Sequence, residues 1–349
     1  MKEFIYSIIT EKQKGFVAHI IKVFLWPFSM LYGFSVRVRR NLYEMGLLPS
    51  YRFQQRVISV GNLTVGGTGK TPLVILIAQW LQKKGIKSAI LTRGYMDKDT
   101  ASDEAAVLQS RLPFTTILVG ANRVQNAKKF IENHDVNVFI LDDGFQHFKI
   151  ARDVNIVTID STNPWGNGYV LPYGLLREPL SALSRADIFV LTKSNMIGSK
   201  ISEIKDRIKS IKSDAAIVET IHEPQSLINA VSASPSDLSI LKGETVCAFC
   251  SIGDPASFEW TLKNLGANVV KIFPFMDHHL YNKSDIESII SFCQTQNIKM
   301  IITTHKDAVK LESSLNNFQK LSLFYLEINL KITQGQELFF DRMDRLLRR

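Results

Sequence analysis

The chain has 349 residues, enough for one large α/β domain or two ordinary ones, and its 45% hydrophobic and 21% charged residues exclude disorder as a whole. Three cysteines are too few for a disulfide framework, which favours a reducing compartment. The net charge is +9, and residues 1–56, with nine basic and three acidic residues, hold +6 of it. This distribution argues against a uniformly basic nucleic-acid-binding protein and indicates an anionic membrane surface as partner of the N-terminal segment.

The N-terminal segment contains an uncharged apolar run of 14 residues, Val23–Val36. A membrane-spanning helix needs about 20 mostly apolar residues, so this length favours a monotopic helix that lies in one leaflet. A single span that extends back to Gly15 and a helix buried against the protein are the alternatives. Helical spacing separates an apolar side from a polar stripe. The apolar side contains Phe24, Phe28, Leu31 and Phe34, and the stripe contains Lys22, Ser29, Gly33, Arg37 and Arg40.

From residue 56 onward the chain alternates between strand-like and helix-like segments, which predicts a parallel sheet with helices on both faces. The first series has expected strands at 57–60, 88–92, 116–119, 136–141, 154–159 and 188–191, and helices at 72–84, 104–109, 123–133 and 201–211. After a turn-rich stretch at 227–239, the second has strands at 246–249, 269–272, 300–303 and 324–328, helices at 256–265 and 285–294, and a basic helix near the end. We therefore expect a membrane-associated helical segment at 1–55, a core at 56–225 and a smaller C-terminal α/β lobe at 226–349.

The strongest motif is a glycine-rich loop that follows the first expected strand and precedes a helix, which is the context of a phosphate-binding P-loop. Its glycines allow backbone N–H groups to turn toward phosphate oxygens. Lys70 would reach the β- and γ-phosphates of a nucleotide, and the Thr71 hydroxyl would ligate Mg²⁺. The strict pattern has Gly where Thr64 stands. The predicted nucleotide-binding residues of the loop are Thr64, Val65, Gly66, Gly67, Thr68, Gly69, Lys70 and Thr71.

A second motif is the apolar segment 138–141, which ends in Asp142 and Asp143. Carboxylates at the end of a parallel strand lie at the carboxyl edge of the sheet, where the P-loop is also expected. One of the two would hold Mg²⁺, and the sequence leaves open which one. The core 56–225 is therefore predicted to have the P-loop NTPase fold.

Together these residues resemble the tetraacyldisaccharide 4′-kinase (lipid A 4′-kinase) family. Residues 61–72 are similar to that family's P-loop, including the Thr at position 64, and the block Asp-Asp-Gly-Phe-Gln-His at 142–147 is its most distinctive sequence. The resemblance extends from about residue 15 to about residue 330. Further blocks follow in family order at 92–95, 152–153, 171–172, 176–179, 185–187, 277–279 and 306–307.

The resemblance implies a membrane-associated P-loop lipid kinase that uses ATP and Mg²⁺. It would phosphorylate the 4′-hydroxyl of a tetraacylated glucosamine disaccharide 1-phosphate in the assembly of lipid A, the anchor of lipopolysaccharide. This step takes place at the cytoplasmic face of the bacterial inner membrane, to which the N-terminal helix would attach the enzyme peripherally or monotopically. The acceptor lipid and the anionic membrane surface are the expected partners, and neither nucleic acid nor an obligate protein partner is implied.

The resemblance also implies the catalytic groups. Asp103 is the expected acceptor of the hydroxyl proton, with His278 as its partner and His279 as the alternative partner. In this family the acidic pair is usually followed by Pro, whereas Ala105 follows here, so an N-cap role for Asp103 is the competing interpretation. The remaining expected site residues are Lys70, Asp142 and Asp143 as catalytic groups, Gln146 and His147 at the nucleotide, and Tyr95, Arg123, Arg177 and Glu178 at the substrate.

A membrane-attached regulatory ATPase of the P-loop class is the alternative function, but its signature lysine would stand at the position of Val65. A non-catalytic membrane scaffold would have no need of Lys70, Thr71 or Asp142. Cys247 and Cys250 have the spacing of a zinc or redox pair, but the apolar strand pattern around them predicts buried structural cysteines.

Overall fold

The computed structural model describes residues 7–9, 13, 15–94, 103–318 and 321–347. The chain divides into two units, each built from separate stretches of sequence. Unit 1 comprises Met1–Gly94, Leu112–Ile221 and Leu330–Arg349, and unit 2 comprises Tyr95–Arg111 and His222–Asn329. The chain passes from unit 1 to unit 2 after Ile221, near the boundary expected at residue 225. The helix that begins at Asp103 belongs to unit 2, although it lies within the expected core, and the helix that begins at Gln336 belongs to unit 1, although it lies within the expected C-terminal lobe.

Unit 1 contains a parallel sheet in the order β7-β6-β5-β1-β4-β2-β3, as the alternating pattern predicted. Strand β1 is central, between β4 and β5. Since all these strands are parallel, their carboxyl ends meet at one edge, which brings the loop after β1 and the acidic pair after β4 together. The strands are β1 Arg56–Asn62, β2 Ser88–Thr92, β3 Thr116–Val119, β4 Val138–Asp142, β5 Val154–Asp160, β6 Ile188–Thr192 and β7 Ala216–Asn229, the last of which continues into unit 2.

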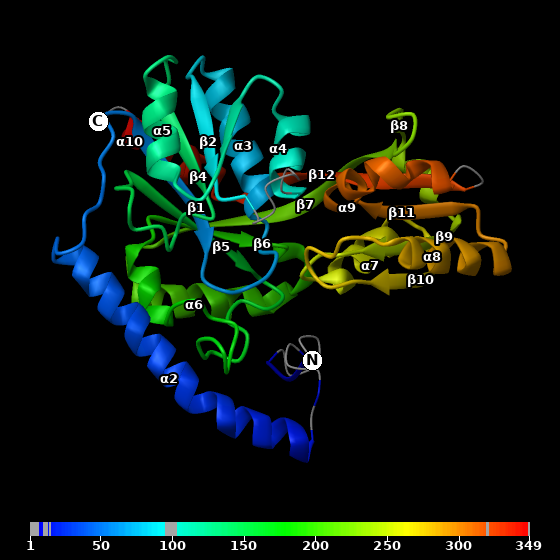
Figure 1. The fold of residues 1–349 in the computed structure, drawn as a ribbon, viewed down its shortest axis with the longest axis horizontal. Helices are drawn as coiled ribbons and strands as arrows, with labels where there is room; N and C mark the ends of the chain where they lie inside the picture. The colour runs from blue at the N-terminus through cyan, green and yellow to red at the C-terminus, as the bar shows by residue number, and fades with distance from the viewer. Residues whose placement is uncertain (1–6, 10–12, 14, 95–102, 319–320, 348–349) are drawn as a thin grey trace. The chain divides into compact units, whose positions relative to one another are not determined.

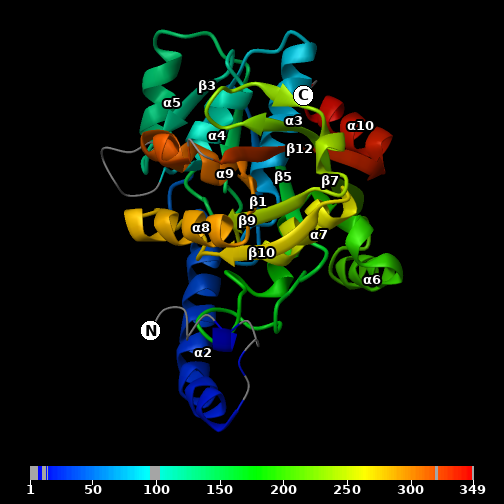
Figure 2. The same ribbon diagram turned by 90° about the vertical axis from the view of Figure 1, so that its right-hand side faces the viewer.

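Helices cover both faces of this sheet. Helix α3 (Lys70–Lys83) and helix α6 (Ile201–Ile211) lie on opposite faces (Figure 1). Helix α5 (Arg123–Ile131) packs against β2 and β3. Helix α10 (Gln336–Leu347) lies beside α3, where the rings of Trp80 and Phe340 stack with centroids 5.5 Å apart (Figure 2). The fold class expected for the core, a parallel sheet with helices on both faces, is therefore confirmed.

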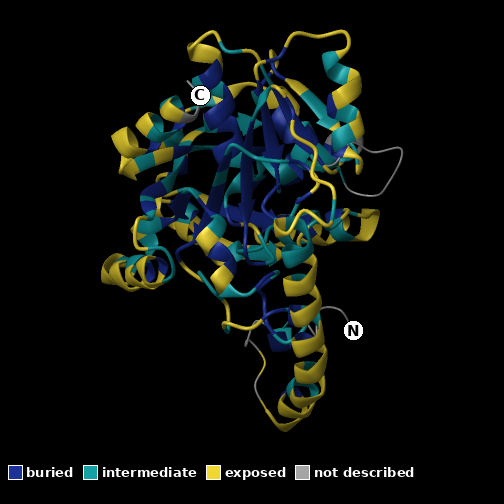
Figure 3. Cartoon of the chain, turned by 90° about the vertical axis from the view of Figure 1, so that its left-hand side faces the viewer, coloured by how far each residue is buried: buried dark blue, intermediate teal, exposed yellow. Residues whose placement is uncertain are grey.

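The N-terminal helix α2 (Phe16–Glu44) projects from unit 1 with most of its surface exposed (Figure 3). Among the described residues it is the one helix long and apolar enough to cross a membrane. Ser29 and Gly33, placed on a polar stripe by their spacing, are buried against the protein, and the Ser29 hydroxyl donates to the Val170 carbonyl oxygen at 2.7 Å. The exposed side is apolar and contains Phe16, Val17, Ile20, Val23, Phe24, Trp26, Phe28, Leu31 and Phe34.

Unit 2 contains further parallel strands, in the order β10-β9-β11-β12. Strand β9 packs on both of its faces: Val246 and Ala248 meet a cluster that includes Leu262, and Cys247 and Phe249 meet a cluster that includes Ile289. Its strands are β9 Thr245–Cys250, β10 Asn268–Pro274, β11 Met300–Thr304 and β12 Ser322–Gln334, which ends in unit 1, with the short β8 Pro235–Ser236 paired to β7. Its helices are α4 Asp103–Arg111, α7 Pro255–Asn264, α8 Lys283–Thr295 and α9 His305–Ala308.

The three cysteines lie inside unit 2. Cys247, Cys250 and Cys293 are buried and free of disulfides. Burial raises the pKa of the Cys250 thiol to about 12, so this side chain is a neutral, unreactive core group at physiological pH. The prediction of buried structural cysteines is confirmed.

Candidate active site

The P-loop joins β1 to α3 at the carboxyl edge of the unit 1 sheet. Gly66 and Gly69 have φ values of 116° and 81°, which lie in the region that favours glycine. No side chain caps the start of α3, and the first N–H groups of a helix have no partner within it. The loop and the helix N-terminus therefore offer backbone donors to an anion such as a phosphate group.

Side chains at the ends of β1, β5 and β6 form hydrogen bonds with the P-loop. The Asn62 amide donates to the Thr64 carbonyl oxygen at 2.7 Å, and the hydroxyls of Thr68 and Thr158 lie 2.7 Å apart. The Thr192 hydroxyl donates to the Thr68 carbonyl oxygen at 3.2 Å. The shape of the loop is thus fixed by β1, β5 and β6 before any ligand binds.

The block that follows β4 packs closely under the P-loop strand. A Cβ atom on Gly61 would lie 2.6 Å from the backbone nitrogen of Phe145, so only glycine fits there. The Gln146 amide donates to the Asn62 carbonyl oxygen at 3.0 Å, while its own Oε1 is buried with no hydrogen-bond partner in the described structure. Gln146 therefore supports the strand that carries the P-loop, and its free acceptor remains for a ligand.

Asp142 ends β4 and is almost fully buried. Its Oδ2 accepts a hydrogen bond from the Thr92 hydroxyl at 3.3 Å, and its Oδ1 is buried without a partner in the described structure. Burial raises the pKa of Asp142, and the charge of Asp143 raises it further. A buried carboxylate with one unsatisfied oxygen is stabilised by an added cation.

Asp143 has a left-handed backbone, with φ of 49°. Arg177 donates to both of its carboxylate oxygens, at 2.9 and 2.8 Å, and Lys70 Nζ lies 3.6 Å from Oδ1. Burial alone would raise the pKa of Asp143, but the charges of Lys70 and Arg177 outweigh burial and hold it at about 2. The buried Arg123 donates to the Asp143 backbone carbonyl oxygen at 3.3 Å. Asp143 is thus ionised at physiological pH and lies beside Lys70 of the P-loop.

A cleft of about 640 Å³ opens beside the P-loop within unit 1. Its described lining residues include five basic side chains and one carboxylate, that of Asp143. This excess of positive charge favours an anionic ligand. The lining residues are Tyr32, Arg39, Val65, Arg93, Ala121, Asn122, Arg123, Val124, Asp143, Gln146, His147, Lys149, Leu171 and Arg177.

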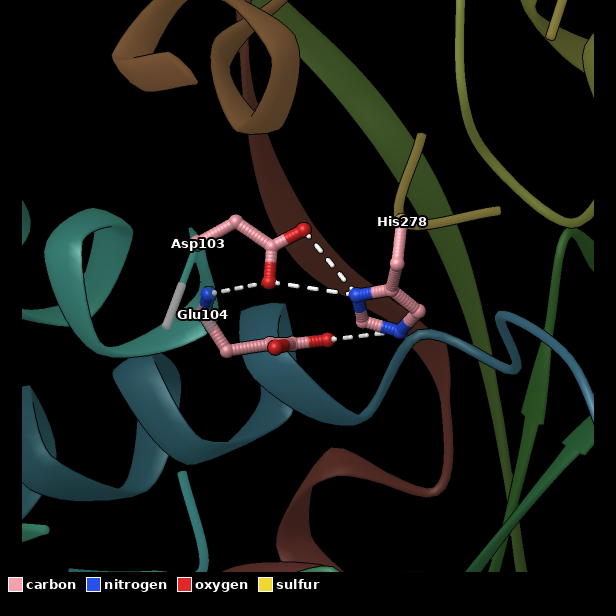
Figure 4. A group of neighbouring side chains, drawn as sticks. All are labelled: Asp103, Glu104 and His278. Atoms are coloured by element: carbon pink, nitrogen blue, oxygen red, sulfur yellow. Dashed lines mark hydrogen bonds and ion pairs between the residues drawn. The ribbon is translucent and has the colours of Figure 1, made fainter. Parts of the chain in front are cut away.

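Unit 2 holds the other expected catalytic pair. The His278 Nδ1 lies 3.2 and 3.1 Å from the two carboxylate oxygens of Asp103, and since a carboxylate only accepts, Nδ1 is the donor (Figure 4). Nε2 of the same ring lies 3.4 Å from Glu104 Oε1. Asp103 and Glu104 open helix α4, so the imidazole faces two carboxylates from one helix start. His279 instead pairs with Asp285 at 2.8 Å.

The charges around this pair move its pKa values in opposite directions. Burial opposes ionisation of Asp103, but hydrogen bonding with His278 and the charge of Lys306 outweigh it and lower the Asp103 pKa. Burial would lower the His278 pKa, and the bond to Asp103 reverses this and raises it above 6.5. Burial raises the pKa of Glu104 to about 7. Within the pair, His278 is thus a better proton acceptor near neutral pH than Asp103.

Two lysines place positive charge behind Asp103. Lys306 Nζ lies 3.5 Å from Asp103 Oδ2 and 3.1 Å from Glu104 Oε1. These carboxylates and His278 lie close enough together to hold a metal ion, but the Lys306 ammonium already supplies a cation there. Lys310 Nζ lies 3.4 Å from Asp103 Oδ2 and 3.3 Å from Asp307, whose side chain is fully buried.

The structure thus places the sequence-predicted residues in two groups. Unit 1 holds the P-loop, Asp142, Asp143, Gln146, His147, Arg123 and Arg177, and unit 2 holds Asp103 and His278. Glu178 stands apart, because it is buried and paired with Arg185 at 2.8 Å and does not line the cleft. Tyr95 lies outside the described residues. Sequence reasoning missed Glu104, Lys310 and the cleft cations Arg39 and Lys149; the net charge of +6 in residues 1–56 was the signal for Arg39 alone.

Comparison with known proteins agrees with this geometry. A family model described as tetraacyldisaccharide-1-P 4′-kinase matches residues 21–348. A tetraacyldisaccharide 4′-kinase of Syntrophus aciditrophicus (strain SB) is 39% identical over 333 residues, which cover 87% of this chain and 88% of the relative. The chain belongs to the tetraacyldisaccharide 4′-kinase family. It is therefore a lipid kinase of lipid A biosynthesis, which phosphorylates the 4′-hydroxyl of its disaccharide acceptor at the expense of ATP, as the sequence indicated.

Two further comparisons extend over nearly the whole kinase. A tetraacyldisaccharide 4′-kinase of Elusimicrobium minutum (strain Pei191) is 36% identical over 337 residues, covering 90% of this chain and 89% of the relative. A crystal structure of LpxK from Aquifex aeolicus in complex with ATP matches with a TM-score of 0.72 and 30% identity, covering 94% of this chain and 99% of the other. The P-loop kinase fold expected from the sequence is confirmed.

The pair of Lys310 and Asp307 predicts a large effect on stability. Replacing Lys310 by Met leaves the fully buried Asp307 without its cation, so we expect the free energy of unfolding of Lys310→Met to fall by about 3 kcal/mol in urea denaturation. The control is Lys263→Met, because Lys263 forms an exposed pair with Glu259, and its loss should change stability by less than about 0.5 kcal/mol. Equal losses in the two variants would contradict a buried, structurally required pair.

Proposed function

We propose that the P-loop of unit 1 binds the triphosphate of ATP, and that the Asp103–His278 pair of unit 2 receives the proton of the acceptor hydroxyl. The observation that carries this proposal is the arrangement of Lys70, Asp143 and Arg177 beside a loop with left-handed glycines at 66 and 69. These groups supply backbone donors and two cations at one edge of the sheet. Charge developing on the transferred phosphoryl group is best stabilised by such pre-positioned donors.

The residues at this edge fit Mg²⁺. The supporting observation is the buried Asp142 Oδ1, which has no hydrogen-bond partner in the described structure, since hard oxygen ligands suit this cation. Asp142 and the Thr71 hydroxyl, in the first turn of α3, are the proposed ligands. Asp143 is less suitable, because Arg177 already occupies both of its carboxylate oxygens. When bound, the ion would neutralise phosphate charge during transfer.

His278 is the proposed proton acceptor, and Asp103 its positioning partner. With Nδ1–H bound to Asp103, the lone pair of a neutral ring lies on Nε2. In the proposed step the 4′-hydroxyl oxygen bonds to the γ-phosphorus, the bond from that phosphorus to the β–γ bridging oxygen breaks, and ADP leaves. The hydroxyl proton passes to Nε2, and the Asp103 carboxylate stabilises the resulting imidazolium.

The arginines of the cleft are proposed to contact phosphate groups. Arg123 and Arg177 both line the cleft and both hold Asp143, so they also fix the acid that pairs with Lys70. Gln146 and His147 line the same cleft, where Gln146 has a free acceptor. Glu178 is proposed to act indirectly, by pairing with Arg185.

Helix α2 is the proposed membrane attachment. Its outward side presents large apolar residues, among them Phe16 at 79% and Phe24 at 68% exposure. Arg37, Arg39 and Arg40 follow this apolar stretch, as expected for a helix that lies in the interface with its basic end at the anionic surface. Since lipid A assembly uses a lipid acceptor, we propose the cytoplasmic face of the bacterial inner membrane as the location.

The function is tested directly by a product assay. With γ-labelled ATP and a tetraacylated disaccharide 1-phosphate in detergent micelles, we expect label to appear on the lipid. Lys70→Ala should abolish this transfer with the fold retained, because the charge of Lys70 follows the phosphoryl group. Its control is Lys84→Ala, beyond the far end of α3, which should keep normal turnover. Normal turnover by a folded Lys70→Ala protein would remove the P-loop from the reaction.

The pH profile distinguishes the two members of the proton-accepting pair. Only neutral His278 accepts a proton, so kcat/KM should fall as the pH drops below the raised His278 pKa. Asp103→Asn removes the group that raises this pKa, so the acid limb should move to lower pH while kcat falls by roughly 10²–10⁴-fold. His279→Gln is the control and should leave both unchanged, since His279 pairs with Asp285. An acid limb that stays in place in Asp103→Asn would contradict this division of roles.

If α2 attaches the protein to the membrane, substitutions on its apolar side should weaken vesicle binding, and substitutions of apolar residues elsewhere should not. The double variant Phe24→Ser/Phe28→Ser should bind vesicles of phosphatidylethanolamine and phosphatidylglycerol roughly 10-fold or more weakly, because two aromatic side chains that insert into the bilayer are lost. Phe114→Ser is the matched control, since Phe114 is 85% exposed but lies outside α2. Vesicle sedimentation measures both. Unchanged binding by the double variant would place the attachment elsewhere.

A further inference from the structure

Besides Arg93, the cleft of unit 1 has basic side chains of two kinds. Arg123 and Arg177 are bound to Asp143. Arg39 and Lys149 line the same cleft, yet the side chain of neither forms a salt bridge or hydrogen bond with any residue that the structure describes. Both are exposed at the cleft. Their charges are thus uncompensated within the described protein, which leaves them available to an anion.

Arg39 is held in place although it has no acidic partner. Its guanidinium lies 5.9 Å from the centroid of the Tyr43 ring and 5.7 Å from that of Phe148, and these two rings stack at 5.3 Å. Stacking on aromatic faces leaves the N–H groups of a guanidinium free and limits its motion. An arginine fixed in this way loses little further entropy when it binds a phosphate bidentately.

His147 lies in the same positive environment. It lines the cleft, and its Nε2 is buried without a hydrogen-bond partner in the described structure. Burial lowers the pKa of His147 to about 4, and the charges of Arg123, Arg152, Lys149 and Arg39 contribute. The ring is therefore neutral at pH 7, and repulsion among the cations is relieved only when negative charge enters.

A phosphate in this part of the cleft could belong to the nucleotide, to bulk membrane lipid or to the acceptor. Tyr32 and Arg39 both come from α2, the helix whose outer side is apolar. The Tyr32 hydroxyl donates to the carbonyl oxygen of Arg177, whose side chain reaches Asp143 and so connects to Lys70. The cleft is thus lined both by the proposed membrane helix and by the P-loop residue Val65. The acceptor likewise presents two separate groups, its 1-phosphate and its 4′-hydroxyl, which are on different sugars.

We propose that Arg39 and Lys149 form a subsite for the phosphate monoester at position 1 of the acceptor disaccharide, with His147 beside it. This inference rests on the proposed function and assigns recognition of the 1-phosphate, which the acceptor of this family carries, to two named residues. An acceptor without it leaves the two cations unpaired and binds more weakly.

The test compares two acceptors that differ in one group, the tetraacylated disaccharide with and without its 1-phosphate. We expect the wild-type kinase to prefer the phosphorylated acceptor by roughly 10–100-fold in kcat/KM, as charge-assisted hydrogen bonds provide. Arg39→Ala and Lys149→Ala should each lose most of this preference, through kcat/KM for the phosphorylated acceptor alone, with the KM for ATP unchanged. Arg40→Ala is the matched control, since Arg40 is the next residue of α2 and pairs with Glu44. It should keep the full preference.

The alternatives give different results. A preference that survives in Arg39→Ala overturns the subsite. If it survives while the KM for ATP rises, the cations serve the nucleotide. If it survives while vesicle binding falls in Arg39→Ala, they serve bulk lipid headgroups. Wild-type protein that phosphorylates neither acceptor would refute the proposed function itself, whereas wild-type activity without a preference refutes only the subsite.

Discussion

The carboxylate of Asp143 connects the P-loop to the rest of unit 1. It lies between Lys70 and Arg177, and the Arg177 carbonyl oxygen accepts the hydroxyl of Tyr32 from α2. Each of these cations would be costly to leave unpaired in a partly buried site, and Asp143 compensates both. The left-handed backbone at Asp143 is unusual for a residue with a side chain, but an Asp tolerates it, and these ion pairs offset the strain.

Compensation of charge in a partly buried site also governs unit 2, where several carboxylates meet several cations. Here the carboxylates of Asp103, Glu104 and Asp307 meet Lys306, Lys310 and the His278 ring. Hydrogen bonding with His278 and the charge of Lys306 hold Asp103 in its ionised form, and the bond to Asp103 in turn favours a protonated His278. A strongly stabilised carboxylate is a poor base. Within the pair, proton acceptance is therefore left to the imidazole rather than to the acid.

Local pattern predicted the sheet, the P-loop and the acidic pair, because the loops that leave parallel strands all lie at one known edge of the sheet. Asp103 and His278 are 175 positions apart, so no spacing could join them, and only the family resemblance did. The choice between His278 and His279 needed coordinates, as did the burial of Glu178 against Arg185. Helical periodicity grouped Ser29 and Gly33 with the basic residues of α2, yet the two lie against Val170. Periodicity describes the sides of a helix but not which side the protein covers.

Because Ser29, Tyr32 and Arg39 lie on one helix, α2 cannot be replaced without affecting the cleft. The residues that seat α2 on unit 1 and the residues that line the cleft alternate along it with the large apolar side chains. A foreign anchor fused in place of α2 would supply the proposed membrane attachment, but it would remove the cleft residues that α2 contributes. In the proposed arrangement, anchorage and substrate selection are therefore inherited together, and this helix is not an interchangeable tag.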